Sequence, residues 1–222
     1  MTTVITEIKS ECEIPEEQKL KWLGYENTTV LDISEHMNHV GLGNKIKNSF
    51  SRYTFSRIIA PLIENVQKYN KVLYLDTDIL ILNDFLKIFE IDLGECFFGA
   101  SVDYVVQFGF KHDYIKFIHD KYIEFGIEKH NENIYFNAGV LLYNMSKIKI
   151  HLNEYIEKLR FLNSVYYEHP WDFCDQDTLN LGFDICQLPQ IYNKQFYFSP
   201  KTKEDVFIHF TTGNKNVFDG QV

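Results

Sequence analysis

The sequence has few cysteines, and none of them forms a pair with the short spacing of a redox or zinc motif. The four cysteines are scattered along the chain, at Cys12, Cys96, Cys174 and Cys186. This scatter argues against the dense disulfide framework of a small secreted scaffold and predicts reduced thiols in a cytosolic protein. We expect Cys96 and Cys186 to be small residues of the core.

Long apolar stretches and a targeting segment are also missing from the sequence. No apolar stretch is long enough to span a bilayer. The first residues do not combine a basic segment with a following apolar run, as a secretory signal does. We therefore expect a cytoplasmic protein without an integral membrane segment.

Basic residues are in the minority. Asp and Glu total 31 against 22 Lys and Arg, which gives a formal net charge of -9. Because nucleic acids are bound by basic protein faces, this balance argues against nucleic acid as the main partner. It leaves room for an anionic ligand that is held through a metal ion. The hydrophobic fraction of 45% over 222 residues predicts one substantial globular domain.

The chain does contain an alternation of strand-like and helix-like segments. Runs of apolar and branched residues predict strands over residues 4–8, 28–33, 71–82, 96–102, 135–144, near 185 and over 206–210. Helices are expected over residues 14–24, 50–66, 85–89, 114–125, 146–163 (capped by Ser146) and 175–182. Residues 34–48 are polar and rich in glycine, which predicts an irregular loop. The alternation predicts an α/β fold with a central, mostly parallel sheet flanked by helices, and with ligands at the carboxyl ends of the strands.

One stretch, from Lys71 to Leu82, carries the strongest signal. An apolar run meets two aspartates, Asp76 and Asp78, and then resumes. Such a run predicts a strand that is buried on both faces. Because an unpaired buried charge is costly, the aspartates either bind a divalent cation or each has a basic partner. Phosphatases of the haloacid dehalogenase type also have Asp-x-Asp after a strand, but they have Thr or Val two positions after the second Asp, where this chain has Leu80. A phosphatase is therefore the less favoured enzyme class.

Five separated blocks carry a resemblance to a known family. They are residues 52–57 (RYTFSR), 71–82 (KVLYLDTDILIL), 136–142 (FNAGVLL), 175–180 (DQDTLN) and 209–215 (HFTTGNK). In this order the blocks resemble glycosyltransferase family 8, whose members are retaining enzymes of the GT-A fold that use nucleotide sugars. The resemblance implies a single GT-A-like catalytic domain over residues 1–222.

The resemblance implies a metal site. Asp76, Asp78 and His209 would bind Mn2+, with Mg2+ as the alternative ion. A mixed set of carboxylates and imidazole suits manganese better than calcium. From the residues alone, a hydrogen-bonded histidine at a strand end is the simpler interpretation of His209.

A set of donor-binding residues is implied as well, made up of Arg57, Asp76, Thr77, Asn137, Ala138, Gly139 and Lys215. The residues alone leave other interpretations open. Arg57 is also consistent with a surface arginine, Lys215 with a solvated lysine, and residues 137–139 with a β-bulge.

The family pattern further implies the position of the reacting sugar. Asp175 and Gln176 would lie nearest the anomeric carbon, and Asp103 would face the sugar or the acceptor together with Gln176. Because a glutamine is a poor nucleophile, retention would proceed by front-face attack through an oxocarbenium-like state that Asp175 stabilises. Asp175 could equally be a helix N-cap. Residues 104–133 are expected to shape the acceptor side.

The chain also departs from the family pattern. No Ala/Asp/Asn cluster precedes residues 4–8, so we expect the family's first βα unit, which grips the nucleotide base, to be missing. We predict metal-dependent, retaining transfer of a hexose, glucose or galactose, from a UDP-sugar to a carbohydrate, lipid-linked or protein acceptor. The alternative is a non-catalytic relic of the scaffold that acts as a binding or assembly module.

Overall fold

The computed structural model describes residues 4–6, 28–30, 33–42, 52–109, 112–126, 133–168, 173–198 and 200–211. The expected helix over residues 14–24 lies outside these ranges. The expected strands near the amino terminus are present as β1 (Val4–Thr6) and β2 (Thr28–Val30), which pair in parallel.

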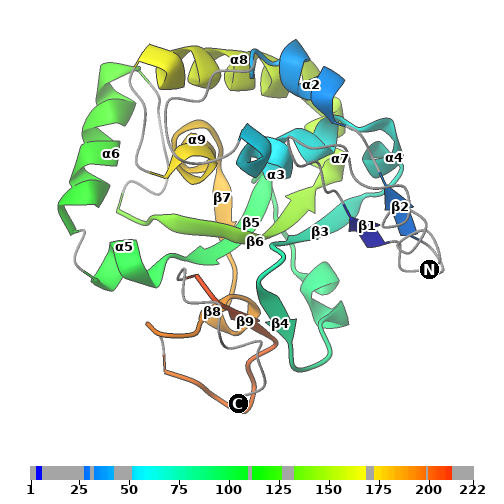
Figure 1. Ribbon diagram of the computed structural model, residues 1–222, viewed down its shortest axis with the longest axis vertical. Coiled ribbons are helices and arrows are strands. Elements are labelled where there is room, and N and C mark those ends of the chain that lie inside the picture. Colours follow the sequence, from blue (N-terminus) through cyan, green and yellow to red (C-terminus); the bar gives the residue numbers. More distant parts are fainter. Residues whose placement is uncertain are drawn as a thin grey trace.

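A four-stranded sheet forms the centre of the fold (Figure 1). Its order is β3 (Lys71–Leu75), β6 (Phe136–Asn144), β5 (Phe98–Val102) and β7 (Ile185–Gln187). β6 runs antiparallel to both neighbours, whereas β5 and β7 are parallel, so β3, β5 and β7 share one direction. The sheet is therefore mixed: three of its four strands share one direction, as predicted, but β6 runs the other way and makes two of the three pairings antiparallel. The carboxyl ends of β3 and β5 lie at the same edge as the amino end of β6.

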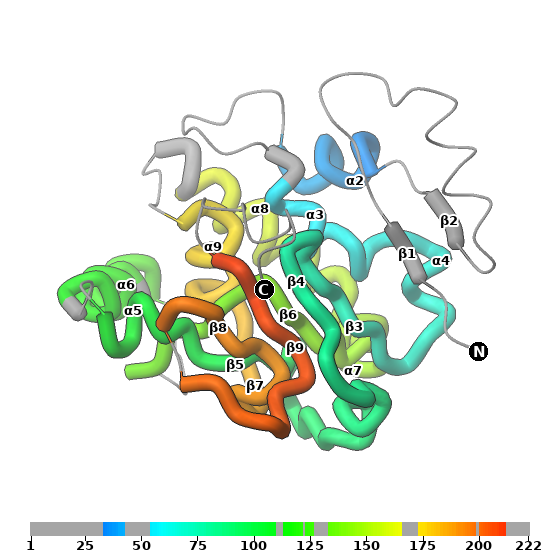
Figure 2. The backbone as a smooth tube through the Cα atoms, turned by 60° about the horizontal axis from the view of Figure 1, so that its bottom comes forward, coloured from blue at the N-terminus to red at the C-terminus, as the bar shows by residue number. Residues whose placement is uncertain are grey.

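A second, smaller sheet begins where β3 ends. Its order is β4 (Ile79–Ile81), β9 (Phe207–His209) and β8 (Lys194–Gln195), with β4 antiparallel and β8 parallel to β9. Figure 2 shows β4 and β9 side by side. The predicted single strand over residues 71–82 is thus wrong. The Asp76 amide makes the last bond to the central sheet, at 2.8 Å from the Gly139 carbonyl oxygen, and the Asp78 carbonyl accepts the first bond of the second sheet.

Burial differs along this broken strand. All residues of β3 are half-buried, and Leu80 and Ile81 in β4 are exposed. The expectation of burial on both faces is therefore wrong as well. The strand that does fit that expectation is β6, of which all residues but the last are buried.

Some of the helices differ from the predicted ones only in their ends, whereas the helix expected over residues 146–163 is divided in two. They are α2 (Ser34–His39), α3 (Ser56–Ile59), α4 (Glu64–Gln67), α5 (Tyr104–Phe108), α6 (His112–Glu124), α7 (Met145–Ile150), α8 (Leu152–Glu168) and α9 (Cys174–Gly182). Short 3-10 turns cover Arg52–Phe55, Ala60–Leu62, Leu86–Glu90 and Gln190–Tyr192. The described helices include none that is both long and apolar enough to cross a membrane.

Three helix predictions need correction. Residues 34–48 are not wholly irregular, because α2 forms there with Met37 fully buried. The helix expected over residues 50–66 is broken into short pieces around Pro61, whose ring and missing N–H disrupt a regular helix. The helix after β6 is capped by Asn144, not by Ser146, since the Asn144 side chain accepts the Lys147 N–H at 3.2 Å.

The core lies on both faces of the central sheet. Alternate residues of β6 divide between two apolar clusters, with Leu141 and Tyr143 on one face and Val140 and Leu142 on the other. Figure 1 places α3, α8 and α9 over the first face and the second sheet against the other. Cys96 and Cys186, which were expected in the core, are free thiols that are only half-buried. The predicted site residues meet at the edge of the central sheet that is formed by the carboxyl ends of β3 and β5.

Candidate active site

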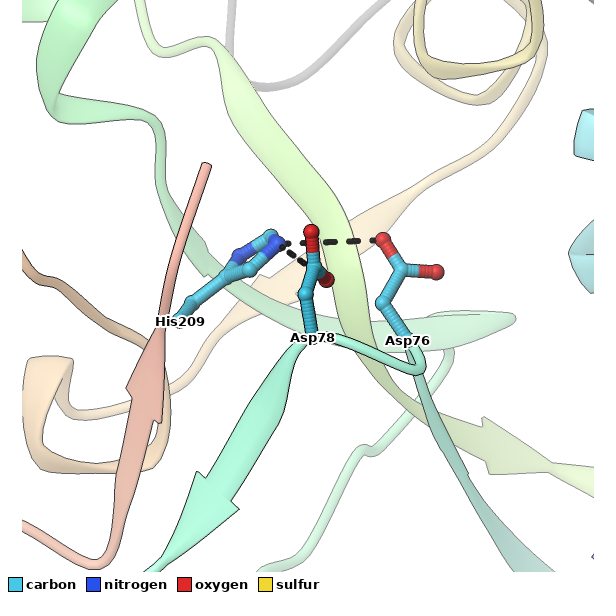
Figure 3. Close-up of side chains that lie close together, drawn as sticks. All are labelled: Asp76, Asp78 and His209. Carbon is cyan, nitrogen blue, oxygen red and sulfur yellow. Dashed lines mark ion pairs between the residues drawn. The ribbon is translucent and has the colours of Figure 1, made fainter. Parts of the chain in front are cut away.

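Two aspartates and a histidine converge at this edge (Figure 3). Asp76 follows β3, Asp78 precedes β4, and His209 ends β9, where it pairs with Ile79. The His209 Nε2 lies 3.3 Å from Asp78 Oδ1 and 3.8 Å from Asp76 Oδ2. One ligand atom from each residue lies within 4.8 Å of the others. A single cation could therefore contact all three.

The chemistry of these atoms fits a divalent cation. The two carboxylate oxygens of Asp76 have different partners. Oδ1 accepts a hydrogen bond from the Tyr74 hydroxyl at 2.7 Å and forms an ion pair with the Arg57 Nη2 at 3.1 Å. Its Oδ2 faces His209. Carboxylate oxygens with an imidazole nitrogen suit a borderline or hard metal ion. Bound there, such an ion would act as a Lewis acid toward an anionic ligand.

Gly139 makes room for the histidine. A Cβ atom placed on Gly139 would lie 2.1 Å from His209 Cε1 and 2.7 Å from Nδ1. The imidazole therefore packs directly on the backbone of β6. Any side chain at this position would displace the ring.

Arg57 joins the metal-site aspartate to Asp175. Its Nε lies 3.0 Å from Asp175 Oδ2, and its Nη2 lies 3.1 Å from Asp76 Oδ1. Both side chains of the Arg57–Asp175 pair are largely buried, so the surface interpretation of Arg57 is wrong. Burial raises the pKa of Asp175 to about 6, and the positive charge of Arg57 opposes that rise. Asp175 lies in the first turn of α9, whose N-cap position is Phe173.

Asp103 and Gln176 form a second cluster beside this pair. Asp103 caps α5 by accepting the Val105 and Val106 N–H groups on Oδ1. Its Oδ2 accepts the Asn137 Nδ2 at 2.9 Å and the Gln176 Nε2 at 3.1 Å. The Gln176 Oε1 accepts the Ala138 N–H at 2.9 Å. Gln176 is thus held at both ends of its amide group.

The chain is similar to a known family of enzymes. The family model of glycosyl transferase family 8 matches residues 4–216. The chain belongs to glycosyltransferase family 8. A Haemophilus influenzae protein named as a candidate glycosyltransferase is 28% identical over 153 residues, which are 68% of this chain and 40% of that protein. The chain therefore spans less than half the length of that curated relative.

Solved structures show the same fold. The WbbM bifunctional glycosyltransferase aligns with a TM-score of 0.61 at 21% identity, over 86% of this chain and 36% of WbbM. The galactosyltransferase LgtC, in complex with donor and acceptor sugar analogs, aligns with a TM-score of 0.55 at 23% identity, over 85% of this chain and 68% of LgtC. The GT-A-like fold that the sequence predicted is confirmed.

Within this family 8 chain, the structure brings together most of the predicted residues. Thr77 is exposed at the tip of the turn between the two aspartates. Lys215 lies outside the described residues. The expected absence of the first βα unit stays a prediction.

Two contributors to the site, Tyr74 and Asn193, were not predicted from the sequence. Tyr74 lies within the apolar run of β3, where nothing in the pattern marks its hydroxyl as a partner of Asp76. Asn193 lies between a 3-10 turn and β8, fully buried, with its amide between Asn137 and His209. Only the pairing of β8 with β9 brings it there, so no local signal identifies it.

Proposed function

We propose that this family 8 chain is a metal-dependent, retaining glycosyltransferase that moves a hexose from a nucleotide sugar to an acceptor. The observation that carries the proposal is the single guanidinium of Arg57, which contacts both Asp76 of the cation site and Asp175 beside Gln176. A cation that holds a diphosphate at Asp76 and Asp78 would therefore place the attached sugar next to Gln176.

The residues around this point suit transfer with retention. Gln176 carries no charge and is held by Asp103 and Ala138, so it is a fixed hydrogen-bonding group and a poor nucleophile. Asp175, paired with Arg57, supplies negative charge near the carbon on which positive charge would develop. This arrangement supports front-face attack by the acceptor through an oxocarbenium-like state. Mn2+ or Mg2+ would stabilise the departing nucleotide.

UDP-glucose and UDP-galactose are the proposed donors, by resemblance to the family. The acceptor is a glycan, a lipid-linked sugar or a protein side chain. We also propose that the protein is cytoplasmic, that it has no integral membrane segment and that nucleic acid is not among its partners. Family membership removes the support for the phosphatase alternative.

The test is donor turnover by the purified protein. We expect Mn2+-dependent release of UDP from UDP-glucose or UDP-galactose, and its loss in Asp76→Asn and Asp78→Asn. Asp84→Asn is a matched control, because Asp84 is exposed on the loop after β4 and outside the site.

Two outcomes would count against the enzyme. Turnover that persists in both site variants would contradict the metal assignment. If the wild type shows no turnover, and if no nucleotide with Mn2+ raises its Tm, the results would instead support the non-catalytic relic.

A further inference from the structure

A chain of buried side-chain amides leads to the back of His209. Asn137 Oδ1 accepts the Gly139 N–H at 2.9 Å and the Asn193 Nδ2 at 2.8 Å. On its other side, Asn193 Oδ1 lies 3.0 Å from His209 Nδ1. The side chains of this relay, Asn137, Asn193 and His209, are all buried, with Asn193 fully excluded from solvent. Water cannot readily replace a missing partner at such a place.

The directions of these hydrogen bonds follow from one backbone group. The Gly139 N–H can only donate, so the Asn137 atom that faces it must be the oxygen. Because that oxygen can only accept, Asn193 must present its NH2 group to it. The Asn193 oxygen is then the atom that faces His209 Nδ1. A carbonyl oxygen accepts, so Nδ1 must carry a proton.

This assignment determines what His209 offers to the cation site. In neutral imidazole a proton on Nδ1 leaves Nε2 with a free lone pair. Nε2 is the atom that faces Asp76 and Asp78. We propose that Asn193 is a positioning residue that fixes the Nδ1–H tautomer of His209 and thereby directs Nε2 at the bound cation. Metal-binding histidines depend on such partners of the second ring nitrogen.

The same relay reaches the sugar side of the site. The NH2 group of Asn137 donates to Asp103 Oδ2, which also accepts the Gln176 amide. Asp103 thus orients Gln176 directly and His209 through two asparagines. Asn137 is the member that contacts both sides, through Asn193 on the metal side and through Asp103 on the sugar side. The proposal deepens the proposed function and rests on it for the identity of the ligand, a divalent cation that holds a nucleoside diphosphate.

The first test needs no metal. In protein labelled with 15N-histidine, NMR at about pH 8, above the ordinary histidine pKa of about 6.5, reports which ring nitrogens carry protons. A His209→Gln variant assigns the signal. We expect a protonated Nδ1 in the metal-free wild type. An unprotonated Nδ1 with a protonated Nε2 would overturn the proposal.

The second test is Mn2+ affinity, measured by EPR of the free ion. Asn193→Leu removes the acceptor and keeps the branched shape of the side chain, and we expect it to raise the Kd for Mn2+ about 10–100-fold. Asn163→Leu is the matched control: Asn163 is equally buried, but it contacts the Val40 carbonyl, on the helix layer away from the site. The control should bind Mn2+ as the wild type does.

Further outcomes separate the two proposals. A folded Asn193→Leu protein with wild-type Mn2+ affinity would overturn the role of Asn193. If Asn193→Leu does not fold, Asn193→Ala replaces it, and the tautomer of the wild type still decides the matter. A wild type that binds no Mn2+ would count against the metal role in the proposed function, while the NMR result would still decide the tautomer.

Discussion

Gly139→Ala should disable the cation site without a change in charge or in any ligand. Carbon atoms pack at roughly 3.5–4.0 Å, whereas the new Cβ would lie 2.1 Å from His209 Cε1. The imidazole must therefore retreat by roughly 1 Å or more, or β6 must shift. Because the ring is buried and held by Asn193, neither adjustment leaves Nε2 in place.

The expected magnitude follows from that displacement. Changes that disturb the positioning of a metal ligand typically cost about 10–100-fold in metal affinity, so we expect the Kd for Mn2+ to rise by about 10²-fold, the upper end of that range. Overpacking a buried position also costs about 1–3 kcal/mol of the free energy of unfolding. For a chain of this size, each kcal/mol lowers the Tm by about 2–4 °C.

Gly99→Ala separates the two effects. Gly99 lies in β5 of the same sheet, and its added Cβ would meet Leu93 Cδ2 at 2.8 Å and Leu188 Cδ2 at 2.9 Å, with no contact to the site. EPR titration of Mn2+ and thermal unfolding by circular dichroism would be measured for both variants. We expect both to lose stability and only Gly139→Ala to lose Mn2+ affinity. Wild-type affinity in Gly139→Ala would refute the account of the histidine.

Two further predictions concern charge. Arg57→Lys should lower the rate of UDP release about 10²-fold, because an ammonium cannot span Asp175 and Asp76 as the guanidinium does; a wild-type rate would refute the bridging role. Burial raises the pKa of Asp177 to about 7, although Tyr135, Tyr114 and the Phe173 N–H donate to it. The folded protein then holds a proton that the unfolded chain releases, so this stabilisation is present below about pH 4 and is lost as pH rises to about 7. Asp177→Asn should flatten the decline of Tm across that range; an unchanged slope would contradict the assignment.

The features that could be predicted from the sequence are those in which residues close together in the chain share a role. Asp76 and Asp78 are two positions apart at the end of an apolar run, and the structure keeps them together. The helix over residues 175–182 has clear local signals and forms as α9. The sequence also carries a periodic signal for α2. Ile33, Met37 and Val40 are spaced as on one helix face, and all three are buried around α2.

The remaining features depend on contacts between distant segments. The apolar pattern of residues 71–82 is equally compatible with one strand or two, because apolar residues continue on both sides of the two aspartates, so the break at Asp76 could not be foreseen. Asp103 was expected to face the sugar, yet its oxygens accept four N–H groups of the protein. Asn193 contacts residues 56 and 16 positions away. Such hydrogen-bond partners become visible only once the chain is folded.

The most direct test of the cation site is a crystal of the protein with Mn2+ and UDP, measured at the manganese absorption edge. We expect an anomalous peak bounded by Asp76 Oδ2, Asp78 Oδ1 and His209 Nε2, with the diphosphate of UDP bound to the same ion. UDP bound in the crystal with no anomalous peak among these three atoms would contradict it.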